Sequence, residues 1–181
     1  MSDFILQERT LGQMLDETAA RFPDREALIN VGHDFRQTWS EFADTVDRLA
    51  RGLMALGIQP GEKIALWATN VPYWVSMMFA SARIGVILVA VNTNYRDSEL
   101  EYLIRQSECE NFCCIDGFLD YDYVAALYRV IPELEKSSKG ALSCEKFPHL
   151  RRVMSLSDIP HPGILSMSEI LARADEVSIE D

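Results

Sequence analysis

Two short apolar runs in this chain lack the alternation of a half-exposed strand. Ile64 to Ala68 reads IALWA and Val86 to Val91 reads VILVAV, and neither contains a charged residue. Such runs are typical of parallel strands that helices cover on both faces. The segment between them has helical spacing of its apolar residues, and Pro72 suits the first turn of that helix. Short connections of this kind predict right-handed crossovers within a parallel sheet.

Capping boxes and turn residues place further elements along the chain. Thr10 with Gln13, and Thr38 with Glu41, form Thr-x-x-Gln and Thr-x-x-Glu boxes at the starts of two amphipathic helices, and Ser98 with Glu101 predicts a third capping box. Strands are predicted at 27–31 and 35–39 as a hairpin, then at NFCCI (111–115) and RRVMSL (151–156), with helices at 121–131 and 167–174. The whole pattern predicts one α/β domain over residues 1–181: a mostly parallel sheet flanked by helices, an N-terminal helix, a short hairpin and a mobile insertion at 132–149.

The composition excludes several classes of partner. Lys plus Arg is 17 and Asp plus Glu is 28, so the net charge of −11 repels nucleic acid and anionic membranes. The N-terminus lacks the basic and apolar regions of a secretory signal. The stretch 71–91 has the length of a membrane span, but Arg83 near its middle and Gly85 after it favour two buried elements instead. We therefore expect a cytoplasmic protein with no nucleic-acid partner and no transmembrane segment.

Common catalytic and cofactor motifs are absent from the 181 residues. The sequence contains no GxGxxG, GxxxxGK[ST], HExxH or GxSxG pattern. Its three histidines are far apart in sequence and are interpreted as surface or turn residues. The four cysteines have no zinc-site spacing and are predicted to be reduced core residues: Cys109, Cys113, Cys114 and Cys144. Spacing alone therefore assigns no catalytic, cofactor-binding or metal-binding residue.

Three stretches together resemble the N-terminal part of the adenylate-forming enzymes, the acyl-CoA synthetase and luciferase-like superfamily. TWSEF (38–42) is similar to that family's Thr-Tyr-x-Glu-Leu motif. ARIGVILVAVNTNYRDSELEYLI (82–104) is similar to its small-Gly-x-x-x-x-Pro-x-Asn motif, with Ala90 or Val91 where proline is common. LYRVIPELEKSSKGALSCEKFPHLRRVMSL (127–156) looks most like medium- or long-chain fatty-acyl-CoA synthetases. The resemblance covers about residues 10–175.

The resemblance implies a ligase as the complete protein. Such enzymes join a carboxylate to ATP, usually with Mg²⁺, and CoA then displaces AMP to give a thioester, so fatty acid, ATP, Mg and CoA are implied. The family's Ser/Thr/Gly-rich phosphate loop ending in Pro-Lys does not occur in these residues, nor do its adenine-binding segment, ribose-binding acid or lid lysine. No catalytic residue is carried over, no cofactor is expected to bind these residues alone, and they are expected to be inactive.

Two groups of residues are candidates for the parent enzyme's substrate site. Ligands of open α/β sheets bind beyond the carboxyl ends of the strands, so the turn after VILVAV could form a cleft rim: Asn92, Asn94, Tyr95 and Arg96. The alternative is a capped turn. Large side chains of the helix from Pro72 could line an acyl channel: Trp74, Met77 and Met78. The alternative is ordinary core packing.

Two other functions remain open at this point. One is a stand-alone, non-catalytic module that binds acyl chains or a protein partner. The other is a dinucleotide-binding domain, against which the missing glycine fingerprint argues. If these residues are a truncated ligase, sheet edges that the remainder of the enzyme would cover are left exposed and predict self-association.

Overall fold

The centre of the molecule is a four-stranded parallel sheet in the order β4-β3-β5-β8. The computed structural model describes residues 8–178. The sheet strands are β3 (Lys63–Trp67), β4 (Ile87–Ala90), β5 (Asn111–Cys114) and β8 (Arg152–Ser155). Two antiparallel hairpins lie outside the sheet: β1 (Glu26–Asn30) with β2 (Phe35–Thr38), and β6 (Gly117–Phe118) with β7 (Tyr121–Asp122). The predicted fold class is confirmed.

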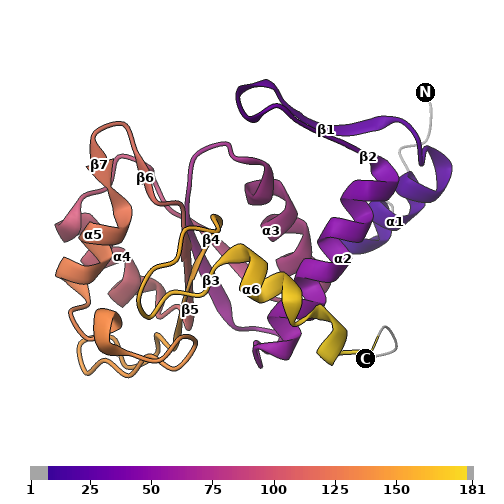
Figure 1. The fold of residues 1–181 in the computed structure, drawn as a ribbon. Helices are drawn as coiled ribbons and strands as arrows, with labels where there is room; N and C mark the ends of the chain where they lie inside the picture. The colour runs from indigo at the N-terminus through magenta and orange to yellow at the C-terminus, as the bar shows by residue number, and fades with distance from the viewer. Residues whose placement is uncertain (1–7, 179–181) are drawn as a thin grey trace, which may run out of the picture.

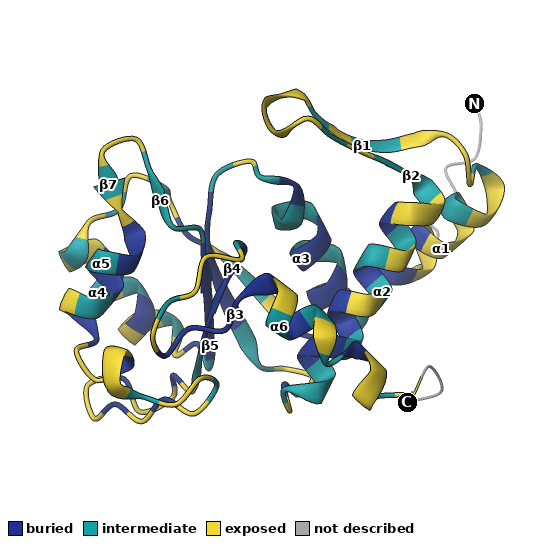
Figure 2. Ribbon diagram, viewed as in Figure 1, coloured by how far each residue is buried: buried dark blue, intermediate teal, exposed yellow. Residues whose placement is uncertain are grey.

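Helices cover both faces of the sheet, which Figure 1 shows nearly edge-on. On one side lie α4 (Asp97–Ser107) and α5 (Tyr123–Val130); on the other lie α2 (Trp39–Ala55), α3 (Pro72–Arg83) and α6 (Met167–Ala172), with α1 (Leu11–Arg21) against α2 and α3. Short 3₁₀ turns occur at Val31–His33, Leu134–Lys136 and Ala174–Glu176. Figure 2 shows burial concentrated on the strands and on the inner helix faces.

Alternate residues of β3 supply the two halves of the core. Ala65 and Trp67 pack with α4 and α5, whereas Ile64 and Leu66 pack with α2, α3 and α6. All four are 0% exposed, as expected for a strand covered on both faces.

Two of the three predicted capping boxes are confirmed. The Gln13 amide donates to the Thr10 hydroxyl at 3.1 Å, and Thr38 with Glu41 repeats the arrangement. The third box is wrong, because α4 begins at Asp97 and Ser98 lies inside it. Glu99 accepts from the Arg96 amide at 3.0 Å, so the carboxylate three residues after Arg96 fixes the helix start.

The run 86–91 contains a parallel strand as predicted, but that strand lies at an edge of the sheet rather than in its interior. Among the described residues, β4 is an edge strand that pairs only with β3, and Ile87 is 51% exposed. An apolar run predicts cover on both faces, but it does not distinguish an interior strand from an edge strand whose outer neighbour is absent among residues 8–178. The opposite edge, at β8, is bridged by Leu165.

The segment 132–149 has little regular structure but contributes to the core. Leu134, Leu142, Cys144 and Phe147 are buried with the α4–α5 side of the sheet. Its polar residues lie between these apolar ones, which is why the sequence looks like an insertion. The mobility of the segment stays a prediction.

All four cysteines are free and buried, which confirms their interpretation as core residues. None of the helices within 8–178 has the length and hydropathy that a bilayer span requires.

Candidate ligand cleft at the carboxyl end of the sheet

A hollow of about 470 Å³ lies beyond the carboxyl ends of β3, β5 and β8. Its walls come from the residues that follow these strands, from the start of α3 and from the β1–β2 hairpin: His33, Phe35, Thr69, Val71, Pro72, Tyr73, Ile115, Asp116, Gly117, Leu156 and Ser157. We call it the carboxyl-end cleft. Open α/β sheets bind ligands at this end because the loops there are free to vary while the strands hold them in place.

A polar network forms the floor of the carboxyl-end cleft. Asp116 follows β5, and its Oδ1 accepts the Ser157 hydroxyl at 3.0 Å and meets Nε2 of His161 at 2.7 Å. The Ser155 and Ser157 hydroxyls lie 3.2 Å apart. Since Ser157 and His161 both bond to the same carboxylate oxygen, Asp116 orients two side chains from the loop after β8. The Ser157 hydroxyl is directed to Asp116 rather than to the imidazole, so this is not the geometry of a nucleophilic triad.

The β1–β2 hairpin forms the roof. Its residue Asn30 donates to the Asn70 carbonyl at 2.8 Å, which ties the hairpin to the loop before α3. Asn30 also accepts from the His33 amide at 3.2 Å, and its Oδ1 lies 3.0 Å from His33 Nδ1. The 3₁₀ turn is thereby held and His33 is placed at the cleft.

Tyr73 supplies a hydroxyl on the α3 side. Burial raises the pKa of Tyr73, and the nearby Asp158 raises it further while Arg48 acts in the opposite sense. The phenol therefore stays protonated at neutral pH. Tyr73, Thr69 and Asp116 are polar residues in the lining of the carboxyl-end cleft, which also includes the apolar residues Val71, Ile115 and Leu156.

The turn predicted as a cleft rim lies after β4 and does not line this cleft. The Asn92 side chain accepts from the Asn94 amide at 2.9 Å, and its carbonyl accepts the Trp67 indole N–H at 3.1 Å. Arg96 lies over the Tyr121 ring at 4.1 Å and donates to the Asn94 and Tyr95 carbonyls, each at 3.3 Å. These contacts are those of a fixed turn, and a role for the four residues at a substrate stays a prediction.

The proposed acyl-channel residues differ in burial. Met77 is 0% exposed and belongs to the core on the α2–α3 side, whereas Trp74 and Met78 are half-buried. Their neighbour Tyr73 is the α3 side chain that reaches the carboxyl-end cleft. An acyl-lining role for Trp74, Met77 and Met78 stays a prediction.

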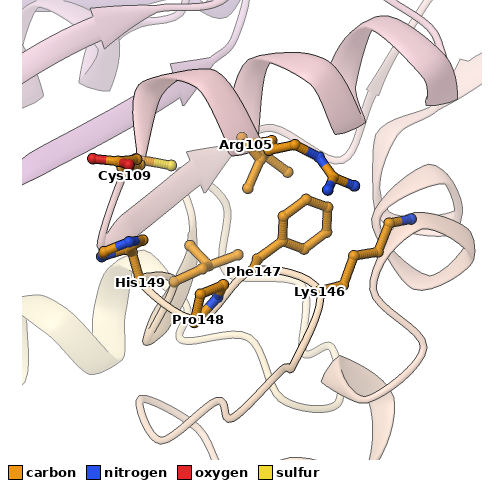
Figure 3. Close-up of a pocket in the computed structure, with 9 residues that line it drawn as sticks. Arg105, Cys109, Lys146, Phe147, Pro148 and His149 are labelled. Carbon is orange, nitrogen blue, oxygen red and sulfur yellow. The ribbon is translucent and has the colours of Figure 1, made fainter.

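A smaller hollow of about 220 Å³ lies at the opposite end of the sheet, between α4 and the segment before β8 (Figure 3). Arg105 and Lys146 lie at its rim, and both pair with Glu101, at 2.9 and 2.7 Å. Burial raises the pKa of the Cys109 thiol, so the only sulfur in the wall is protonated and a poor nucleophile. The cations are neutralised and the thiol is inert, so this hollow is the weaker candidate.

The sequence pattern of one family extends over most of the chain. The AMP-binding enzyme family matches residues 15–163. The chain belongs to that family. This confirms the resemblance to adenylate-forming enzymes drawn from TWSEF and the run from Ala82.

Curated relatives of this chain are named as acyl-CoA ligases. The chain is 40% identical over 171 residues to medium-chain acyl-CoA ligase ACSF2, mitochondrial, of Rattus norvegicus, and 37% identical over 167 residues to the protein of the same name in Homo sapiens. These alignments cover 94% and 92% of the chain but only 28% and 27% of the relatives. The chain therefore spans little more than a quarter of the length of the curated relatives it matches.

Solved structures share the fold at low sequence identity. A long-chain-fatty-acid-CoA ligase (FadD1) from Archaeoglobus fulgidus superposes with a TM-score of 0.71 at 21% identity, over 94% of this chain and 31% of that one. The N-terminal domain of FACL13 from Mycobacterium tuberculosis gives 0.66 at 19% identity, over 94% and 36%. These likenesses establish the architecture of the AMP-binding enzyme.

The residues of the carboxyl-end cleft are not among the predicted site residues, although the sequence contains a pattern that indicates three of the cleft residues. The predicted strands end at Ala68, Ile115 and Leu156, so Thr69, Asp116 and Ser157 are the first residues after three buried strands. Polar side chains directly after parallel strands meet at one edge of the sheet. The contribution of the hairpin, through His33, could not be inferred without the tertiary structure.

Proposed function

We propose that these residues form part of an ATP-dependent fatty-acyl-CoA synthetase, which converts a carboxylate and ATP to an acyl-adenylate and then to a CoA thioester. The observation that carries the proposal is the 40% identity to a medium-chain acyl-CoA ligase over 94% of the chain. Two further observations support the proposal: the order and spacing of the family motifs between Thr38 and Ile104, and the cleft at the carboxyl ends of the strands.

In this proposal the chain supplies scaffold and one wall of the substrate site. Tyr73 and Asp116 line the carboxyl-end cleft, and its apolar walls would exclude water from a bound ligand. The described residues include no group of three or more His, Cys, Asp or Glu side chains placed to hold a metal ion. In this proposal the groups that neutralise the triphosphate belong to other parts of the longer ligase.

A pyrophosphate-exchange assay tests whether these residues are inactive alone and the longer chain is an active ligase. The 181-residue chain with Mg-ATP, radiolabelled pyrophosphate and a medium-chain fatty acid is expected to give no fatty-acid-dependent label in ATP. The matched control is the polypeptide that continues through a Ser/Thr/Gly-rich Pro-Lys loop to the length of the relatives, which is expected to exchange and to form acyl-CoA. Clear turnover by the 181 residues would contradict the proposed inactivity, and an inactive long chain would contradict the proposed ligase.

The carboxyl-end cleft also favours a second function, a non-catalytic module that binds acyl chains or a protein. A volume of about 470 Å³ with largely apolar walls could hold a medium-length chain. Titration with decanoate, read through tryptophan fluorescence, is expected to saturate at micromolar concentration if this function holds. Leu156→Lys should then abolish binding; no saturation up to millimolar decanoate would exclude acyl binding by these residues.

The cytoplasmic location stays a prediction. The matched mammalian ligases are named as mitochondrial, so the two compartments are compared directly by fractionating cells that express the tagged protein.

A further inference from the structure

The outer edge of β4 carries backbone groups that pair with no strand in the described part of the chain. The Ile87 amide donates to the Glu62 carbonyl and the Val91 amide to the Leu66 carbonyl, both at 2.9 Å. Backbone groups alternate in direction along a strand, so odd-numbered residues face β3, and the N–H and C=O groups of Leu88 and Ala90 point outward. No strand within residues 8–178 pairs with that side.

This edge has none of the usual protection against pairing. Residues 86–91 contain no lysine, other charge or proline, and the β3–β4 register is regular from Lys63↔Ile87 to Leu66↔Ala90, with no bulge. The other edge of the same sheet is protected, because the Ser155 amide donates to the Leu165 carbonyl at 2.7 Å and the Leu165 amide to the Val153 carbonyl at 3.0 Å. One edge is closed by the chain itself and the other is left open.

We propose that a strand from the remainder of a longer polypeptide pairs with the outer edge of β4 through Leu88 and Ala90. The inference rests on the proposed function, in which these residues are part of a longer ligase. Two observations select this occupant. The relatives are more than three times as long as the matched region, so a covering strand has an ample source. A second copy of this chain is the weaker choice, because each copy carries a net charge of −11.

Amide hydrogen exchange of the 181-residue chain and of the longer chain tests the pairing. In the short chain, the Leu88 and Ala90 amides should exchange at least about tenfold faster than the Val89 amide, which faces β3. In the longer chain, the Leu88 and Ala90 amides should become protected to the level of Val89. Leu100 and Ile104, buried in α4 in the short chain, serve as reference amides that should change little.

Proline substitutions provide an independent readout, because proline removes one N–H. Ala90→Pro removes an outward N–H and should leave the unfolding midpoint of the short chain nearly unchanged while lowering that of the longer chain. Val89→Pro removes an inward N–H and should lower both midpoints. If Ala90→Pro fails to fold in the short chain, the exchange rates of the unsubstituted chains still decide the question.

The outcomes separate the inference from the proposed function. An active longer ligase in which Leu88 and Ala90 still exchange as fast as in the short chain would overturn the inference alone. Protection of both amides in the short chain, increasing with protein concentration, would overturn it in favour of self-pairing. A reading frame that stops at codon 181 would overturn the proposed function and remove the source of the strand.

Discussion

The rings of Trp67 and Tyr123 are stacked, with centroids 3.6 Å apart and planes inclined by 4°. Trp67 ends β3 and Tyr123 begins α5, and both are 0% exposed. Each ring also holds the turn after β4, since the Trp67 indole donates to the Asn92 carbonyl at 3.1 Å and the Tyr123 hydroxyl to the Thr93 carbonyl at 2.7 Å. The stack therefore connects the sheet, α5 and the turn predicted as a substrate rim.

Substitutions at Tyr123 should separate the hydrogen bond from the packing. Tyr123→Phe keeps the stack and should lower the free energy of unfolding by about 1 kcal/mol. Tyr123→Ala also removes the ring and should cost about 3–5 kcal/mol. Urea denaturation measures both, with Tyr102→Ala as control because Tyr102 is 67% exposed on α4. Equal losses for the Phe and Ala variants would contradict a structural role for the stack.

The pair Asp97–Arg129 should make stability depend on pH. Arg129 donates to both carboxylate oxygens at 2.7 and 2.9 Å, and this bonding, with help from the Tyr121 hydroxyl and against desolvation, lowers the pKa of Asp97. A lowered folded-state pKa contributes stability above the ordinary value of 3.8, and this stability is lost as the pH falls through the folded-state value. Arg129→Gln should therefore destabilise at pH 7, by less than about 1 kcal/mol because both side chains are partly exposed.

The pH dependence of that difference is the measurement. Denaturation of Arg129→Gln and of the unsubstituted chain should give free energies that converge as the pH falls from the ordinary value of 3.8 through the lowered folded-state pKa of Asp97. In an Asp97→Asn background, Arg129→Gln should have almost no effect at pH 7, because the partner charge is gone. A difference that persists unchanged in acid would show that Arg129 acts through packing alone.

Asp116 should be necessary for the shape of the carboxyl-end cleft. Asp116→Ala leaves Ser157 and His161 without their shared acceptor and should lower the free energy of unfolding by about 1–3 kcal/mol. Asp116→Asn retains one acceptor oxygen, so its free energy of unfolding should lie between that of the unsubstituted chain and that of Asp116→Ala. The His161 ring signals in NMR spectra should shift in both variants. Asp120→Ala, at an exposed position on the neighbouring hairpin, is the control. It should change neither the free energy of unfolding nor the His161 ring signals.

Local patterns predicted the fold well, and they failed where long-range pairing decides. The boxes at Thr10 and Thr38 are set by side chains three residues apart, so the sequence contains all the information needed. The edge position of β4 depends on which strands neighbour it, and apolar composition does not encode that. Likewise, the burial of Phe147 depends on α4 and α5, which lie far away in sequence.

The candidate site was only partly predictable for the same reason. The rule that ligands bind beyond the carboxyl ends of strands indicates the end of the sheet at which the carboxyl-end cleft lies. The predicted rim residues follow β4, where Asn92 and Arg96 form hydrogen bonds within the turn itself. The hollow lies instead beyond β3, β5 and β8, because strand order places those ends together under the hairpin.

Close packing between α2 and α6 gives a prediction that opposes helix propensity. Gly52 is buried within α2, and a Cβ built there would lie 2.3 Å from the Ile170 carbonyl oxygen, which is far below contact distance. Gly52→Ala should therefore destabilise the protein by about 1–3 kcal/mol, although alanine favours a helix over glycine by about 1 kcal/mol.

Gly12 is the matched control, because it lies in α1 and its added Cβ would meet Arg83 only at 3.7 Å, an ordinary contact. Gly12→Ala should raise the free energy of unfolding by about 0.5–1 kcal/mol. Thermal and urea denaturation of the two single variants should thus give changes of opposite sign for the same chemical substitution. Stabilisation by both would mean that α6 can move away from α2 at little cost, so that the contact at Ile170 does not fix the position of α6 against the sheet.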